Sequence, residues 1–291
     1  MSLLANSIRL MRPSHSVKNL FIFTPLFFAG HITDTALLIK AMLAFIAFSL
    51  CASAVYIFND VMDADADRKH QKKKKRPIAS GMIKPTIAMM IMAGVIVVGL
   101  LLMALTSTKA LAVILAYIAM NIAYSFRLKH IAIVDVVIIA SGFVMRIFVG
   151  SFATQTSLSI WIVLMTFLLA LFMALGKRRD DVLLFEQTGQ KMRQVIEGYS
   201  LKFIDAAMMM MASVVIVTYI LYTTSAEVLA RLHNNYLYIT TLFVIVGVLR
   251  YMQIVFVQEK GGSPTQIALG DRFIQTTLLL WIVVFAWILY G

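Results

Sequence analysis

The sequence has little charge, almost no cysteine and few residues that bend or loosen a chain. Only 14% of its 291 residues are charged and 61% are hydrophobic, whereas soluble domains carry about 25% charged and about 45–50% apolar residues. It holds 14 glycines, 5 prolines and one cysteine, Cys51, which has no partner for a disulfide. These shortages exclude a soluble enzyme, a disordered scaffold, a collagen and a disulfide-stapled secreted domain. What is abundant, long apolar runs, predicts a polytopic membrane protein.

The apolar runs predict nine membrane spans. A spanning helix needs about 20 mostly apolar residues, and such runs lie at 16–33, 36–59, 86–106, 109–126, 131–153, 157–176, 203–224, 236–257 and 272–290. Pro25 interrupts the first run, and a proline is tolerated there where neighbouring helices satisfy the freed carbonyl. Because no flexible linker or soluble appendage separates the runs, we expect one all-α bundle, a single domain over residues 1–291.

The basic residues fall mostly on one side of this predicted topology. Nine spans put alternate loops on opposite faces of the membrane, and most of the 26 Lys and Arg residues lie in the segments 1–18, 60–85, 127–130, 177–202 and 258–272. The positive-inside rule then places the N-terminus and these loops in the cytoplasm, so we expect a multi-pass protein of the cell's inner (plasma) membrane. Topology explains much of the net charge of +12, and a nucleic-acid partner is not needed.

A dense acidic segment, Asn59-Asp60-Val61-Met62-Asp63-Ala64-Asp65-Ala66-Asp67, follows the second predicted span. If the helix continues past Asn59, then Asn59, Asp60, Asp63 and Asp67 line one stripe and Asp65 points away. Carboxylates this close repel one another unless a cation lies among them. Carboxylate and amide oxygens suit Mg²⁺, which would stabilise the charge on a diphosphate leaving group. The alternative is a solvated loop start balanced by the lysines that follow.

The pattern Asn59-Asp60-x-x-Asp63-x-x-x-Asp67, placed after the second of nine spans, resembles the first aspartate-rich motif of the UbiA superfamily of intramembrane prenyltransferases. The resemblance implies a nine-transmembrane-helix bundle with an active-site cavity on its cytoplasmic side. It also implies that Asn59, Asp60, Asp63 and Asp67 bind Mg²⁺ on a diphosphate, with the three aspartates as catalytic groups.

Further segments are similar to one branch of that superfamily, the decaprenyl-phosphate phosphoribosyltransferases. The similar positions cover most of the chain: Arg12-Pro13, Lys18-Asn19, Phe23-x-Pro25-Leu26, Asp67-Arg68-x-His70, Arg76-Pro77-Ile78-Ala79-x-Gly81, Tyr124-Ser125-x-x-Leu128-Lys129, Asp135, Gly142, Arg146, Lys177-Arg178-Arg179, Arg193, Gly198-Tyr199-Ser200, Ser263-Pro264-Thr265 and Asp271. The resemblance implies a Mg²⁺-dependent transferase that moves 5-phosphoribose from phosphoribosyl diphosphate to a polyprenyl phosphate among the membrane lipids.

The loop after the sixth span departs from the wider superfamily, most members of which carry a second aspartate-rich motif there. Here it reads Lys177-Arg178-Arg179-Asp180-Asp181. Adjacent helical residues diverge by about 100°, so Asp180 and Asp181 cannot repeat the metal stripe. A cationic triplet suits an anion, because arginine forks match phosphate oxygens. We therefore expect Lys177, Arg178 and Arg179 to bind the lipid phosphate.

The remaining polar positions are predicted to bind substrate from the bundle interior. The donor would be neutralised and oriented by Lys18, Asn19, Arg76, Tyr124 and Lys129. Asp135 and Arg146 share a face of the fifth span about 16 Å apart, too far for a salt bridge. Asp135 could hold ribose hydroxyls or Lys129. For Arg146, a structural role bonded to helix carbonyls and a substrate role are equally open.

Two other functions remain open from the sequence. A UbiA-type prenyltransferase, moving an isoprenoid to an aromatic or other acceptor, would use the same acidic stripe, and the missing second stripe counts against it. A transporter places its ionisable groups near the midplane on broken helices, whereas here they crowd one face. In the favoured reaction the phosphate nucleophile is already anionic, so no general base is needed and we expect inversion. The isoprenoid length and the oligomeric state stay open.

Overall fold

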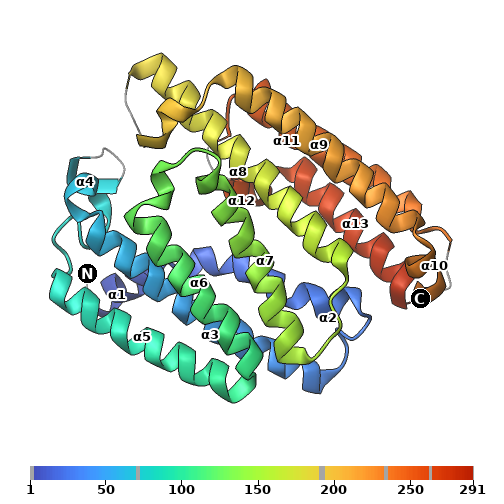
Figure 1. Ribbon diagram of the computed structural model, residues 1–291, viewed down its shortest axis with the longest axis horizontal. Helices are drawn as coiled ribbons and strands as arrows, with labels where there is room; N and C mark the ends of the chain where they lie inside the picture. Colours follow the sequence, from blue (N-terminus) through green and yellow to red (C-terminus); the bar gives the residue numbers. More distant parts are fainter. Residues whose placement is uncertain (1–2, 70–72, 190–193, 233–234, 262–263, 291) are drawn as a thin grey trace. The chain divides into compact units, whose positions relative to one another are not determined.

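The structure is a computed structural model that describes residues 3–69, 73–189, 194–232, 235–261 and 264–290 (Figure 1). Over these residues it contains helices and connecting turns and no strand. The chain forms two compact units. Unit 1 comprises Met1–Leu128 and Gly142–Leu158, and unit 2 comprises Lys129–Ser141 and Ser159–Gly291.

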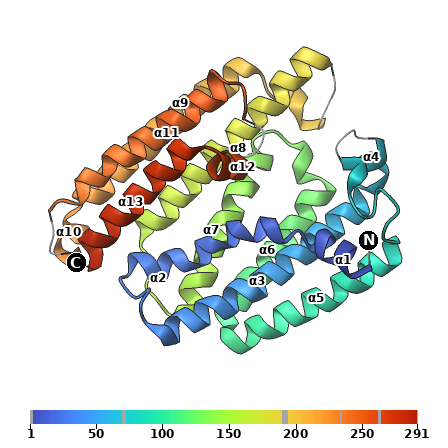
Figure 2. The same cartoon turned by 180° about the vertical axis from the view of Figure 1, so that it is seen from behind.

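Unit 1 holds the acidic segment. Its helices are α1 (Leu3–Met11), η1 (Pro13–Phe23), α2 (Thr24–Phe28), α3 (Thr35–Met62), α4 (Ala64–Lys69), η2 (Lys73–Lys75), α5 (Pro85–Thr106), α6 (Thr108–Phe126) and the later part of α7 (Val134–Thr154). Helix α3 begins where the Asp34 carboxylate accepts hydrogen bonds from the N–H groups of Ala36 and Leu37, at 2.9 and 3.1 Å. Helices α3 and α5 run side by side (Figures 1 and 2).

Two glycines allow backbones to approach closely inside unit 1. A Cβ on Gly99 of α5 would lie 2.7 Å from the Cys51 Sγ, and one on Gly150 of α7 would lie 1.9 Å from the Ile22 carbonyl oxygen. A larger residue at either place would therefore push the neighbouring segment away. Gly150 in this way lets η1 lie directly against the later part of α7.

Eight helices in the described parts of the chain are long and apolar enough to cross a membrane, which makes this an integral membrane protein. They are Thr35–Met62, Pro85–Thr106, Thr108–Phe126, Val134–Thr154, Ile160–Thr188, Leu201–Thr224, Leu237–Phe256 and Arg272–Tyr290, and they match the second to ninth predicted runs. Many of their apolar side chains are exposed, such as Leu105 and Met90, as expected for helices that face lipid.

The first predicted span, 16–33, is not one of these eight helices. The 3₁₀-helix η1 occupies its first part, and the short helix α2 follows. Proline explains the division. Pro13 opens η1 and Pro25 lies in the first turn of α2, where its missing N–H costs no hydrogen bond, whereas inside one long helix it would break the ladder.

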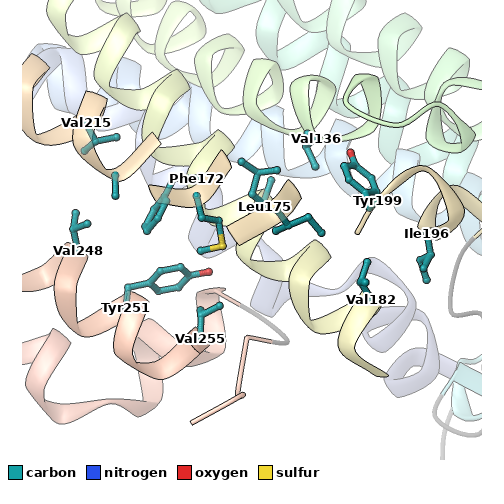
Figure 3. Packing of buried hydrophobic residues seen from close by; sticks show 14 of the residues in the cluster. Val136, Phe172, Leu175, Val182, Ile196, Tyr199, Val215, Val248, Tyr251 and Val255 are labelled. Atoms are coloured by element: carbon teal, nitrogen blue, oxygen red, sulfur yellow. The ribbon is translucent and has the colours of Figure 1, made fainter. Parts of the chain in front are cut away.

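Unit 2 contains the remaining helices. They are the first part of α7, α8 (Ile160–Thr188), η4 (Gln194–Gly198), α9 (Leu201–Thr224), α10 (Ala226–Leu232), η5 (Leu237–Thr240), α11 (Thr241–Phe256), α12 (Pro264–Gly270) and α13 (Arg272–Tyr290), with η3 (Leu128–His130) at the border. The core lies among α8, α9 and α11 (Figure 3), where the rings of Phe172 and Tyr251 are 5.2 Å apart. This packing holds the part of α8 that directly precedes its charged residues Lys177 to Asp181.

Candidate active site

The acidic segment keeps its helical register although α3 ends at Met62. The backbone N–H of Asp63 donates to the Asn59 carbonyl at 2.9 Å, and that of Asp67 donates to the Asp63 carbonyl at 2.8 Å. Asp60 and Asp67 are buried, each 2% exposed, while Asp65 is exposed and pairs with Arg68. Burial thus distinguishes the two faces of the segment as the predicted stripe requires.

Two arginines hold the buried carboxylates. Asp60 Oδ1 accepts from Arg12 Nη2 and, at 3.0 Å, from Arg76 Nη1, which also donates to Asp67 Oδ2 at 2.6 Å. Lys73 Nζ lies 4.0 Å from the other Asp67 oxygen. We call Asp60, Asp67, Arg12 and Arg76 the acidic cluster. The arginines offset the repulsion between two buried carboxylates that would otherwise be costly.

The rest of the predicted metal stripe lies beside this cluster. The Asn59 Oδ1 accepts a hydrogen bond from the Ser125 hydroxyl of α6, and the Asp63 side chain, at the end of α3, is partly exposed. Tyr124, next to Ser125 on α6, is also partly buried. Asn59 thus links the end of α3 to α6 through Ser125.

These donors suit Mg²⁺ by their chemistry, because two carboxylates and an amide oxygen are hard ligands. Their arrangement is not that of an assembled metal site. Over the described residues no group of three or more His, Cys, Asp or Glu side chains is placed to hold a metal ion, and Arg12 and Arg76 are bonded to the carboxylates. Metal binding would require these arginines to release Asp60 and Asp67.

Arg146 is the centre of a second polar group in unit 1. It is 4% exposed and donates to the Asn19 Oδ1 at 2.8 Å and to the Gly142 carbonyl at 2.5 Å. Its guanidinium carbon lies 4.9–5.4 Å from the ring centres of Phe48, Tyr117 and Phe143. Cation–π contacts and neutral acceptors thus hold this charge in place.

Asn19 and Lys18 lie on η1, beside this arginine. Asn19 is buried and its Nδ2 donates to the Ser49 hydroxyl of α3 at 2.8 Å. Lys18 is partly buried and lies outside the eight candidate spans. Burial lowers the pKa of Lys18, and the positive charges of Arg146 and then Arg12 lower this pKa further. Lys18 therefore lies within the electrostatic reach of both arginines.

In unit 2, Arg178 is bonded to two carboxylates. It is 1% exposed, and it donates through Nε to Asp135 at 2.5 Å and through Nη1 to Asp181 at 2.6 Å. The hydroxyl of Tyr199 donates to the other Asp135 oxygen at 2.6 Å and accepts from the backbone N–H of Ile133 at 2.7 Å. Burial, followed by the hydrogen bond to Asp135, raises the pKa of Tyr199. This network joins α7 to α8 and to Tyr199, the residue that follows η4.

Arg179 is also paired within unit 2. Its Nε donates to Asp205 of α9 at 2.8 Å, its Nη1 donates to the Val255 carbonyl at 2.9 Å, and its guanidinium lies over the Phe256 ring. Lys177 and Lys129, the other predicted ligands in unit 2, are partly buried. The predicted phosphate-binding triplet thus contains two arginines that bond to the protein's own acceptors.

Sequence reasoning assigned no role to several residues of these networks. Arg12 stood only in a matching motif, and its left-handed backbone, φ 54°, at the start of η1 brings it to Asp60. The Arg-Pro pair was the one available signal. Nothing in a single sequence links Tyr199 to Asp135, 64 positions away, or Asp205 to Arg179, 26 positions away.

The fold and the acidic cluster together define an integral membrane protein built from helices, with oxygen donors and arginines gathered at the end of one long span. Comparison of its sequence with known families identifies the family to which it belongs. The sequence model of the UbiA prenyltransferase family matches residues 20–274, and this chain belongs to that family.

Within this family, the chain is similar to curated relatives that share one enzyme name. The chain is 34% identical to a decaprenyl-phosphate phosphoribosyltransferase of Mycolicibacterium smegmatis, over 97% of this chain and 91% of the relative. It is 32% identical to the enzyme of the same name from Corynebacterium glutamicum, over 94% of this chain and 84% of the relative. A Mycobacterium tuberculosis H37Rv enzyme of that name is 34% identical, over 97% and 93%.

Solved structures share the fold. A UbiA homolog from Archaeoglobus fulgidus bound to GPP and Mg²⁺ has a TM-score of 0.74 and 19% identity, covering 98% of this chain and all of that one. The apo structure of a UbiA homolog from Aeropyrum pernix K1 has a TM-score of 0.67 and 16% identity, covering 92% and 98%. At these identities the likeness establishes the UbiA fold alone.

Proposed function

We propose that this protein transfers 5-phosphoribose from phosphoribosyl diphosphate to a polyprenyl phosphate, giving polyprenylphosphoryl-5-phosphoribose and pyrophosphate. The observation that carries the proposal is the acidic cluster, in which two buried carboxylates and two arginines meet at the end of α3. Carboxylates for a metal and arginines for phosphate oxygens are the two partners that a diphosphate needs. The names of relatives that match over nearly the whole chain support the phosphoribosyl donor.

In this proposal Asn59, Asp60, Asp63 and Asp67 would hold a Mg²⁺ ion, whose charge would stabilise the leaving pyrophosphate. Arg12 and Arg76 leave the carboxylates and bind the donor's phosphate oxygens instead. Solved UbiA homologs with Mg²⁺ and prenyl diphosphates support a divalent ion in this fold. A divalent ion held by these residues would carry the same charge as the two guanidinium groups that now lie beside Asp60 and Asp67.

The acceptor needs no general base, because its phosphate is already an anion. Catalysis then consists of aligning that oxygen with the anomeric carbon and stabilising the leaving group, and inversion is expected. Tyr124, Lys18 and Asn19 of unit 1 remain predicted donor ligands. Lys129 and Lys177 of unit 2 keep their predicted roles. The protein contacts of Asp135, Arg178 and Arg179 support a positioning role for these three residues.

The proposed orientation places the N-terminus and the acidic cluster on the cytoplasmic side of the inner membrane. The basic loops support it through the positive-inside rule. A water-soluble phosphorylated sugar would then reach the cluster from the cytoplasm, and the lipid phosphate would arrive from the bilayer.

A two-donor assay tests the proposed function. Purified protein with Mg²⁺ receives labelled phosphoribosyl diphosphate and a polyprenyl phosphate in one reaction. In the other it receives a labelled prenyl diphosphate and an aromatic acid. We expect label from the sugar donor in the lipid fraction and none in the prenylated acid. Label moving only from the prenyl donor would overturn the proposal and favour the prenyl transfer that the family name describes.

A further inference from the structure

The segment between α4 and α5 carries exposed lysines that take no part in the acidic cluster. The sequence has no acidic residue between Asp67 and Asp135, so the charge of this segment is positive only. Lys74, Lys75 and Lys84 are exposed. Over the described residues, no ion pair or hydrogen bond involves their ammonium groups. These three cations are therefore available to a partner outside the protein.

The segment is folded, so its lysines extend from a fixed turn. The backbone N–H of Ser80 donates to the Arg76 carbonyl at 2.9 Å, and that of Ile83 donates to the Pro77 carbonyl at 3.0 Å. Ile78 and Ile83 are each 1% exposed and pack in a core cluster with residues of α1 and α3. Arg76 bonds to the carboxylates of the acidic cluster. The turn thus presents its arginine to the protein and its lysines to the surroundings.

An exposed apolar side chain lies among these lysines at the edge of a spanning helix. Met82, two residues before Lys84, is 47% exposed, and the candidate span α5 begins at Pro85. We call Lys74, Lys75, Met82 and Lys84 the basic surface. Lysines beside an exposed apolar side chain, at the point where a helix enters the bilayer, are typical of segments that bind a lipid surface.

Two simpler explanations account for less of this arrangement. The positive-inside rule explains why lysines lie on one side of the membrane, but not why they share one folded turn with Met82. A single phosphate gains little from exposed lysines, because water and salt screen them. An anionic leaflet presents many negative headgroups at once, and each exposed lysine can approach one of them. The charge and the exposure of the basic surface therefore match a leaflet better than one soluble anion.

We propose that the basic surface binds the headgroups of anionic phospholipids in the leaflet beside the start of α5. This lipid surrounds the protein and is not a substrate, so the proposal goes beyond the proposed reaction and does not depend on it. Each lysine close to an anionic leaflet favours it by about fivefold over a neutral one. Because Arg76 belongs to the same turn, the leaflet also holds the segment from which this arginine reaches Asp60 and Asp67.

A fluorophore next to the basic surface measures which lipid lies there. Thr86, exposed in the first turn of α5, is changed to cysteine and labelled with bimane. Cys51 is buried, and protein without Thr86→Cys gives the labelling background. The labelled full-length protein is placed in phosphatidylcholine nanodiscs that contain spin-labelled phosphatidylglycerol or spin-labelled phosphatidylcholine. The ratio of quenching by the two spin-labelled lipids reports the local preference for the anionic one.

Two variants that lose the same charge separate the basic surface from net charge. In the surface variant, glutamine replaces the three lysines of the basic surface. In the control variant, glutamine replaces three exposed cations that are scattered along the chain, Arg127, Lys202 and Lys260. Both variants carry Thr86→Cys, and the melting temperature of each is measured. Exposed lysines without partners contribute little to folding, so the surface variant should melt as wild type does.

At about 0.1 M salt, we expect phosphatidylglycerol to quench wild type and the control variant at least about fivefold more than phosphatidylcholine does. The surface variant should lose this preference, and so should wild type at about 1 M salt. No preference in wild type, an unchanged preference in the surface variant or an equal loss in the control variant would overturn the proposal. Displacement of phosphatidylglycerol by one equivalent of farnesyl phosphate would also overturn it, because the surface would then bind the acceptor substrate.

Discussion

The two units of this protein treat their buried charges differently. In unit 2, Arg178 and Arg179 each bond to carboxylates or carbonyls of neighbouring segments, and Asp135 is fully buried between Arg178 and Tyr199. In unit 1, Arg146 bonds to neutral acceptors, and two aspartates share the guanidinium of Arg76. Charges that are satisfied inside the protein hold helices together, whereas charges that are shared or unmatched are available to a ligand. We therefore propose that the donor's diphosphate binds in unit 1.

The sharpest stability test of this comparison is Arg178→Met. It leaves Asp135 buried beside only the Tyr199 hydroxyl, so the free energy of unfolding should fall by about 3–5 kcal/mol. Adding Asp135→Asn should recover part of the loss. Unfolding in mixed detergent measures both. Unchanged stability with weaker lipid-phosphate binding would instead support the direct phosphate contact that the sequence predicts.

The corresponding change in unit 1 is Arg76→Met, which removes the arginine partner of Asp67, leaves Lys73 at 4.0 Å from that carboxylate, and removes one of the two arginine partners of Asp60. If these arginines exchange between carboxylates and phosphates, the variant should bind Mn²⁺ more tightly in the absence of donor. Its kcat/KM should still fall by about a hundredfold, because the donor loses a phosphate ligand. Electron paramagnetic resonance of Mn²⁺ and the transfer assay supply the two readouts. Weaker metal binding in this variant would show that Arg76 only supports the fold.

A smaller effect is expected for Tyr199→Phe. The change removes one hydrogen bond to Asp135 and leaves the Ile133 N–H without that acceptor. The free energy of unfolding should fall by about 1–2 kcal/mol, while the KM for either substrate stays as in wild type. A changed KM with unchanged stability would move this network from the scaffold of unit 2 to the substrate.

The smallest effect is expected for Arg68→Gln. Arg68 and Asp65 form an exposed pair on the far face of α4, with side chains 52% and 92% exposed. Such pairs contribute about 0–1 kcal/mol, so stability and transfer should both match wild type. A clear loss of transfer would place this face of α4 in the site. It would then contradict the distinction between a functional face with the buried Asp67 and an exposed face without a function.

The sequence predicted those features that depend on local pattern. The length of the apolar runs located the eight helices in the described residues that are long and apolar enough to cross a membrane. The spacing of Asp60, Asp65 and Asp67 separated buried from exposed carboxylates. The resemblance to the UbiA superfamily was confirmed by the family match. The first run, 16–33, is covered by two short helices, η1 and α2, because Pro25 lies in the first turn of α2, where its missing N–H costs no hydrogen bond.

The sequence did not predict which side chains pair with each other over long distances along the chain. Arg178 and Asp135 are 43 positions apart, and Arg146 and Asn19 are 127 apart. Nothing in one sequence says whether an arginine meets a carboxylate, a carbonyl or a ligand. The triplet at Lys177 to Arg179 therefore predicted a phosphate site from charge alone.

Transfer by Asp67→Asn tests the central claim most directly, with Asp65→Asn as the matched control two residues away. Wild type and both variants are given Mg²⁺, labelled phosphoribosyl diphosphate and a polyprenyl phosphate. The account predicts transfer by wild type and Asp65→Asn at equal rates, and a loss of at least about a hundredfold in Asp67→Asn with the protein still folded. Full transfer by Asp67→Asn would contradict the assignment of the acidic cluster to the diphosphate.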